Sequence, residues 1–410
     1  MKSHCQALRY LGVLREGKLG AGKPEDLPIM RDGDAITPSR SCVAMIWVGF
    51  FHKIDTGRSF KMWKQTLNQI QPLSRKWLDT AWKRIDNLTK PRGSLGRLEE
   101  MAARVVAIRE EERPSLSGKE VFVFVGDHGV VLDGVSAYPQ EVTSLMVKNF
   151  LAGGAAINVL ARCTGARVSV IDVGMKQDLR GVEGLINKNV KRGTGNIAQG
   201  QAMTRQEAEK AIDVGIEMAD RAHDNGTEMV ASGEMGIGNT TPSSAVFSAL
   251  LPAAVIDVTG KGTGLDEDGI KHKVDVIKKA LKINQERLGD PISSLAAVGG
   301  LEIAAICGLC LGGAARRMIV VVDGFISSAG ALVAMRLNPT VKDYLFFSHE
   351  SFEKGHRAFF EKEGLRPILD LDLRLGEGTG AALAMQLIQN SVRIHNEMAT
   401  FKDIGIEPGA

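Results

Sequence analysis

Short β-branched runs, each followed by a glycine-rich polar turn and then by a helical stretch, recur along residues 117–351 of this 410-residue chain. The runs that we predict to be strands cover residues 121–125, 168–172, 229–231, 295–298, 318–322 and 344–347. The helices between them carry end signals: Thr204 and Glu207 form a capping box, and Asn225 with Gly226 stops that helix. This alternation predicts an α/β fold, a parallel Rossmann-like sheet with helices on both faces.

The chain changes character at Met62. Residues 1–61 contain scattered Gly, Pro and charged residues with little periodicity. We expect them to be an N-terminal extension that is disordered, or an upstream translation artefact with Met62 as the true start. From Met62, apolar residues recur at roughly helical spacing up to a break at residues 90–93, and Ser94 is then predicted to cap a helix that ends near Glu111.

Charge and composition exclude several classes of function. Residues 1–61 contain 10 Lys and Arg against 6 Asp and Glu, whereas the other 349 residues contain 41 against 42. The main body is therefore neutral, and with only 5% aromatic residues it lacks the basic face and the stacking side chains of a nucleic-acid-binding protein. The most apolar run, residues 43–51, is much shorter than the roughly twenty residues of a membrane span, so we expect no such span.

Five cysteines are an odd and small number for a chain of this length. They indicate reduced thiols and a cytoplasmic location rather than a disulfide framework. Cys307 and Cys310 form a CxxC motif, but no second pair completes a zinc site, and we assign them to helix packing.

The strongest local signal for a ligand site is the segment 233–243, GEMGIGNTTPS. Closely spaced glycines let the backbone approach a ligand, and hydroxyls before a helix start donate to phosphate oxygens at the positive end of that helix. Because neither GxGxxG nor GxxxxGK[ST] occurs, the pattern favours a phosphomonoester such as a mononucleotide over NAD or ATP. Residues 323–330, DGFISSAG, form a second candidate cradle. For both segments the structural alternative is a glycine-rich turn with a hydroxyl cap.

Glu377 stands between Gly376 and Gly378, close to Arg374. Glycines at this place suit a ligand that comes close to the main chain, and partial burial would raise the pKa of the carboxyl towards the range of a general base. The alternative is an ordinary solvated turn residue.

Two further side chains have a functional and a structural interpretation. His128, after Asp127, has no partner at metal-ligand spacing and no GxSxG elbow accompanies it, so we expect a hydrogen-bonding histidine that lines the site, and no metal. Lys273 lies beside the apolar stripe of its predicted helix, where it either snorkels to solvent or reaches a buried anion.

Several motifs together resemble the nicotinate-nucleotide:dimethylbenzimidazole phosphoribosyltransferases. They are KPRGSLGRLE at 90–99, GDHGV at 126–130, FLAGGAAIN at 150–158, the segment 233–243, VGG at 298–300, DGF at 323–325 and RLGEGTGAA at 374–382. They occur in the order of the family, and the resemblance runs from about Met62 almost to the C-terminus.

The resemblance implies transfer of the 5-phosphoribosyl group from nicotinate mononucleotide to 5,6-dimethylbenzimidazole, in the assembly of the cobalamin nucleotide loop, without a cofactor or metal. It implies that Glu377 is the general base, with Glu234 and Lys273 as further catalytic residues. The motifs and the resemblance together predict substrate contacts from Met235, Gly236, Thr240, Thr241, Asp323, Gly324, Ser351, Arg374, Gly376 and Gly378. Tyr138 and Met146, where some members carry Ser and Gln, are predicted to line the azole pocket and leave the preferred azole or phenol open.

The family's fold implies a small helical domain from residues 62–90 and 385–410, an α/β catalytic domain from residues 91–384, and a homodimer whose interface helps to complete the site. Two alternatives stay open: a phosphoribosyltransferase for other azoles or phenols, and a non-catalytic mononucleotide-binding regulator. Glu377 within its glycines favours the enzyme, because a pure binder gains little from a carboxylate near an anionic ligand.

Overall fold

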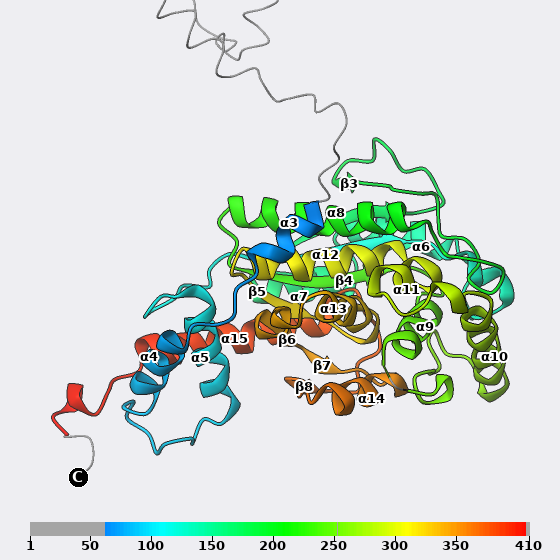
Figure 1. Ribbon diagram of the computed structural model, residues 1–410. Coiled ribbons are helices and arrows are strands. Elements are labelled where there is room, and N and C mark those ends of the chain that lie inside the picture. Colours follow the sequence, from blue (N-terminus) through cyan, green and yellow to red (C-terminus); the bar gives the residue numbers. More distant parts are fainter. Residues whose placement is uncertain (1–61, 252, 407–410) are drawn as a thin grey trace, which may run out of the picture. The chain divides into compact units, whose positions relative to one another are not determined.

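The computed structural model of the chain describes residues 62–251 and 253–406 (Figure 1). Six strands form one sheet in the order β3-β2-β1-β4-β5-β6, β7 pairs with β8, and all of these pairings are parallel. The strands are β1 (Lys119–Gly126), β2 (Arg167–Gly174), β3 (Leu185–Asn187), β4 (Met229–Met235), β5 (Ile319–Val322), β6 (Leu345–Phe347), β7 (His349–Glu350) and β8 (Leu369–Asp370). The predicted parallel α/β fold is confirmed.

Helices connect and cover the strands. They are α3 (Met62–Gln69), α4 (Arg75–Ile85), α5 (Arg97–Arg109), α6 (Val142–Leu151), α7 (Ala156–Thr164), α8 (Arg205–Asp224), α9 (Thr240–Leu250), α10 (Glu267–Ile283), α11 (Pro291–Val298), α12 (Leu301–Ala315), α13 (Phe325–Leu337), α14 (Lys354–Glu363) and α15 (Thr379–Glu397). In Figure 1, α8 and α12 lie on one side of the sheet and α15 on the other. Because both faces are covered, the central strand β1 is buried along its whole length.

Small residues allow α8 and α12 to pack backbone against backbone. A Cβ added to Gly215 of α8 would overlap the carbonyl oxygen of Ala305, and one added to Gly308 of α12 would overlap that of Ile212. Cys307 and Cys310 are buried free thiols in the same helix, which confirms their assignment to helix packing. The capping box of Thr204 and Glu207 also forms, and α8 ends before Asn225 as predicted.

Two sequence predictions of secondary structure are wrong. Residues 295–298 are the end of helix α11 and not a strand: the Asp290 side chain accepts from the Ser293 N–H at 2.8 Å, and Pro291 occupies the first turn. Ser94 is not the N-cap of α5, which begins after Gly96; instead the Glu99 side chain accepts from the Leu95 N–H. The short strands β3, β7 and β8 were not predicted.

The helices near the two ends of the described chain pack in different places. α3 contacts α8 and α12, whereas α4 contacts α5, and α5 contacts α15. An isolated bridge also joins Leu88 to Thr400. The division into a small helical and a catalytic domain stays a prediction. The predicted N-terminal extension, residues 1–61, lies outside the described residues, as do residues 252 and 407–410.

The expectation that no stretch is long enough for a membrane span needs a correction. By length and composition alone, the segment Val142–Thr164 is long and apolar enough, with a mean hydropathy of 1.3. It consists of α6 and α7, separated by a turn that contains Gly153 and Gly154. α6 contacts β1, β2 and β4, and α7 contacts β2 and α15, so both helices pack as part of the α/β core.

Candidate active site

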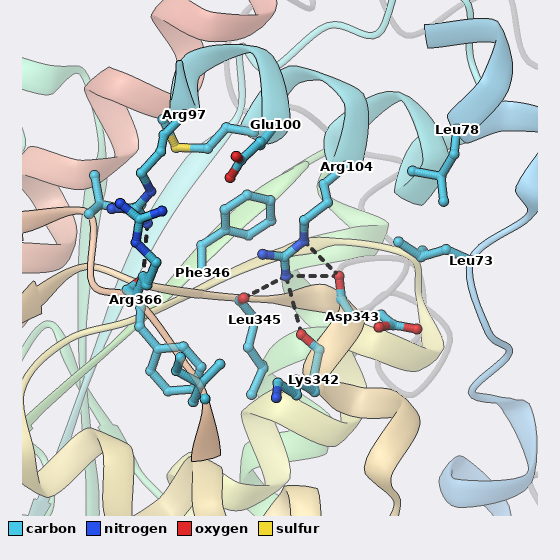
Figure 2. A pocket seen from close by; sticks show the side chains of 15 residues that line it. Leu73, Leu78, Arg97, Glu100, Arg104, Lys342, Asp343, Leu345, Phe346 and Arg366 are labelled. Carbon is cyan, nitrogen blue, oxygen red and sulfur yellow. Dashed lines mark hydrogen bonds between the residues drawn. The ribbon is translucent and has the colours of Figure 1, made fainter. Parts of the chain in front are cut away.

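One cavity of about 470 Å³, shown in Figure 2, lies between α5, β6 and the loop before β8. Arg104 of α5 donates to the carbonyl oxygens of residues 342, 343 and 345, and its guanidinium stands 4.1 Å from the centre of the Phe346 ring. Arg97 donates to the carbonyl oxygens of Arg366 and Pro367. These two guanidinium groups therefore join α5 to main-chain oxygens around β6 and the loop before β8.

A second cavity, of about 430 Å³, opens at the carboxyl ends of β4, β5 and β6. Its wall includes Glu234 and Met235 from the end of β4, Gly324 after β5, and His349 and Ser351 after β6. Ligands of open α/β sheets bind at this edge, beyond the carboxyl ends of the strands. This cavity is the candidate active site.

Most of the predicted site residues meet at this cavity. Eleven of them line it: Tyr138, Met146, Glu234, Met235, Gly236, Thr240, Gly324, Ser351, Arg374, Gly376 and Glu377. The other four, Thr241, Lys273, Asp323 and Gly378, are buried and do not line it. The Thr241 hydroxyl has no partner among the described residues. The backbone N–H of Gly378 donates to Asp323 rather than facing the cavity.

Glu234 is a buried carboxyl at the end of β4, with 5% of its surface exposed. Burial raises its pKa to about 8, with further contributions from the charges of Glu302 and Asp323. The Asn239 side-chain amide donates to its Oε2 atom. A Cβ on Gly376 would overlap its Oε1 atom, so the glycine lets the loop before Glu377 lie directly against this carboxyl.

Glu377 has an unusual backbone and a buried side chain. Its φ of 64° lies in the left-handed region, and only 4% of its surface is exposed. Burial raises the pKa of the carboxyl and the charge of Asp323 adds to this, while a hydrogen bond from the Ile157 backbone N–H opposes it. Its Oε2 atom has no hydrogen-bond partner among the described residues. The side chain is therefore not the solvated turn residue of the structural alternative.

Lys273 does not snorkel, because its surface is fully buried. Its ammonium group donates to the Thr240 hydroxyl at 2.6 Å. Burial lowers the pKa of Lys273 to about 8, and the negative charge of Glu353 opposes that shift. Burial also raises the pKa of Glu353, which lines the cavity. Thr240 is thus bonded to the buried ammonium of Lys273, and Glu353 is a buried carboxyl in the lining of the same cavity.

Part of the cavity lining is apolar. Tyr138, Val142 and Met146, from α6 and the residues before it, face the cavity together with Met235 and Ile237. Tyr138 is 54% exposed and therefore stands at the mouth rather than in the interior. An apolar lining of this kind suits a flat, uncharged ring.

Some residues differ from the sequence expectation or were missed by it. His128 does not line the cavity: it is buried, with Nε2 2.9 Å from Oε1 of Glu302. His349 and Glu353 line the cavity and were not predicted, although both lie near Ser351 in the turn after β6. Within residues 62–251 and 253–406, no three His, Cys, Asp or Glu side chains group in a way that could hold a metal ion.

Comparisons with known proteins show the family of this chain. The family model described as "Phosphoribosyltransferase" matches residues 70–406. A nicotinate-nucleotide–dimethylbenzimidazole phosphoribosyltransferase from Geotalea uraniireducens is 55% identical over 84% of this chain and 98% of its own length, and one from Geobacter sp. strain M21 is 54% identical over the same shares. A crystal structure of CobT from Thermus thermophilus has a TM-score of 0.78 and 47% identity, covering 82% of this chain and all of its own.

Proposed function

The chain belongs to the phosphoribosyltransferase family that includes these nicotinate-nucleotide–dimethylbenzimidazole enzymes, and we propose on this premise that it transfers 5-phosphoribosyl from nicotinate mononucleotide to 5,6-dimethylbenzimidazole. The products are α-ribazole 5′-phosphate and nicotinate, and the reaction serves the assembly of the cobalamin nucleotide loop. One observation carries the proposal. Two buried carboxyls, Glu234 and Glu377, line one cavity together with the apolar side chains of Val142, Met146 and Ile237.

The two carboxyls differ in the surroundings that set their pKa. With a pKa of about 8, Glu234 holds its proton and adds no second negative charge to the wall. Burial also raises the pKa of Glu377, but a hydrogen bond from the Ile157 backbone N–H stabilises its charged form. This difference supports Glu377 as the general base and Glu234 as a hydrogen-bond donor to the ligand.

The reaction needs one base and firm placement of two rings. The Glu377 carboxylate takes the N–H proton of the azole while the other azole nitrogen forms a bond to the anomeric carbon. The bond from that carbon to the pyridinium nitrogen breaks, and its electron pair neutralises the ring as nicotinate leaves. Attack from the face opposite the departing ring inverts the β-nucleotide and gives the α product. Because the leaving group is already cationic, holding the rings in line and removing one proton can suffice.

The test follows nicotinate release from nicotinate mononucleotide with a panel of azoles and phenols. We expect release that depends on the acceptor, and a loss of roughly 10²–10⁴-fold in Glu377→Gln. In the wild type the rate should fall as the pH drops through the raised pKa of Glu377, since only the carboxylate accepts the proton. An unchanged rate in Glu377→Gln would reject its role as base. Nucleotide binding without release in the wild type would favour the non-catalytic regulator instead.

We further propose a homodimer in the cytoplasm. Support for the dimer comes from exposed apolar side chains: Tyr138, Phe352, Leu371 and Leu375 are each more than half exposed, and Tyr138 and Leu375 line the cavity. Support for the compartment comes from the free thiols Cys163, Cys307 and Cys310, which suit reducing conditions. Light scattering after size-exclusion chromatography tests the dimer: a monomer at working concentration contradicts it.

A further inference from the structure

The loop that carries Glu377 has a strained backbone. Gly376, Glu377 and Gly378 have φ values of 81°, 64° and 91°, so three successive residues lie in the left-handed region. A non-glycine residue keeps such a conformation only where its surroundings impose it. Something next to this loop must therefore fix it.

Asp323, directly after β5, contacts the loop through its side chain. Its Oδ2 accepts from the Gly378 N–H at 3.1 Å, and its Oδ1 accepts from the Ala381 N–H at 2.9 Å. The Gly380 N–H adds a third bond to the same carboxyl. These groups form the first turn of α15, where free backbone N–H groups and the helix dipole favour a negative charge. With 1% of its surface exposed, the carboxyl is enclosed by these partners.

His349 encloses the contact from another strand. Its Nδ1 lies 3.8 Å from Oδ1 of Asp323 and hydrogen-bonds the Ser348 hydroxyl at 3.0 Å. The Ser348 hydroxyl in turn donates to the Asp323 carbonyl oxygen at 3.0 Å. A Cβ on Gly380 would overlap the His349 ring, so this glycine lets α15 start directly against it. β5, β7 and α15 thus meet at one buried carboxyl.

We propose that Asp323 is a positioning residue, which holds the Glu377 loop from β5 for proton transfer and makes no contact with the substrate. This assignment replaces the substrate contact predicted for Asp323 and rests on the proposed function of Glu377. It accounts for two observations together: both Asp323 oxygens bind backbone N–H groups of one loop, and Asp323 does not line the cavity that Glu377 lines.

Asp323 has two effects on the site that can be separated. Its hydrogen bonds set the geometry of the loop, and its charge raises the pKa of both Glu377 and Glu234. The titratable groups that interact with it include these two carboxyls and His349. Removal of the charge should lower the pKa of Glu377, whereas displacement of the loop alone should leave the charge in place.

The experiment compares Asp323→Asn with the matched control Asp172→Asn. Asp172 is equally buried at the end of β2 and accepts from the Met175 N–H at 2.8 Å, but its turn carries no residue of the cavity. In Asp323→Asn we expect kcat for nicotinate release to fall on the order of 10–100-fold, KM for nicotinate mononucleotide to change less, and the acid limb of kcat to move to lower pH. Asp172→Asn should keep kcat and the acid limb of the wild type.

A second variant covers the case in which Asp323→Asn does not fold. Gly380→Ala presses on the His349 ring and shifts the first turn of α15 without removing a charge. We expect kcat to fall while the acid limb keeps its pH. Wild-type kcat in either folded variant, or equal losses in Asp323→Asn and Asp172→Asn, would overturn the proposal.

Hydrogen exchange separates this proposal from the proposed function. We expect the backbone of residues 376–381 to exchange faster in Asp323→Asn, or in Gly380→Ala, than in the wild type and Asp172→Asn. If the wild type releases no nicotinate, the proposed function falls, yet the exchange pattern still decides whether Asp323 holds the loop. Unchanged protection in the variants overturns the positioning role even in an active enzyme.

Discussion

Replacing Lys273 by Met should stabilise the protein at neutral pH. The ammonium group is fully buried, and its pKa falls from an ordinary 10.5 to about 8, mainly because burial disfavours its charge. One pKa unit corresponds to about 1.4 kcal/mol, so keeping the charge in the folded protein at pH 7 costs about 3 kcal/mol. Methionine fills a similar volume without that cost, although the Thr240 hydroxyl then loses a hydrogen-bond donor.

The pH dependence of this gain has a defined sign. Between pH 8 and 10.5 the unfolded chain holds the Lys273 proton more tightly than the folded protein, so wild-type stability rises with pH in this window relative to Lys273→Met. The stability difference between the two proteins should therefore shrink by roughly 2–3 kcal/mol from pH 7 to pH 10. Urea unfolding at both pH values measures it, because groups that do not interact with Lys273 cancel between the two proteins.

Lys279→Met is the matched control, since Lys279 is an exposed residue of the same helix α10. The stability of the Lys279→Met protein relative to the wild type should be the same at pH 7 and pH 10. If the stability difference between Lys273→Met and the wild type is also the same at pH 7 and pH 10, burial does not lower the pKa of Lys273 as we infer. Lys273→Met should in addition lose activity, because Thr240 at the cavity loses its cation.

Two further substitutions test other parts of the structure. Gly376→Ala adds a methyl group that overlaps Glu234 and strains a left-handed φ, so nicotinate release should fall on the order of 10²-fold; Gly364→Ala, whose φ is also positive but whose surroundings are open, should retain full activity. Arg104→Met removes several charged hydrogen bonds between α5 and the sheet edge, and should lower the urea-unfolding free energy by about 2–3 kcal/mol at unchanged activity per folded molecule. An activity loss without a stability loss would indicate that the cavity in Figure 2 takes part in the reaction.

Strands with continuous β-branched runs could be predicted because a strand that is buried on both faces has an uninterrupted apolar sequence, as β1 illustrates. The segment 295–298 could not be assigned by its apolar run, because four buried residues fit a strand and a helix end equally well. The decisive signal was upstream, where Asp290 and Pro291 mark a helix start. β7 and β8 contain two residues each and are defined by their pairing rather than by a pattern.

Site residues could be predicted where they directly follow a strand and where their residue type suits contact with a ligand. Glu234, Gly324 and Ser351 follow different strands and meet at one cavity, as the geometry of a parallel sheet requires. The direction of a side chain could not be predicted: Asp323 follows a strand like the others, yet it turns to α15. The surroundings of Lys273 include the Thr240 hydroxyl and the charge of Glu353, which lie far away in the sequence.

The link between β5 and α15 also has a consequence for the timing of synthesis. Translation proceeds from the N-terminus, so the strands of the main sheet leave the ribosome before the Glu377 loop and α15. A nascent chain can therefore assemble the sheet and most of the cavity wall while its base is still missing. Activity should therefore appear in a late step, when α15 docks onto the Asp323 carboxyl at the end of β5.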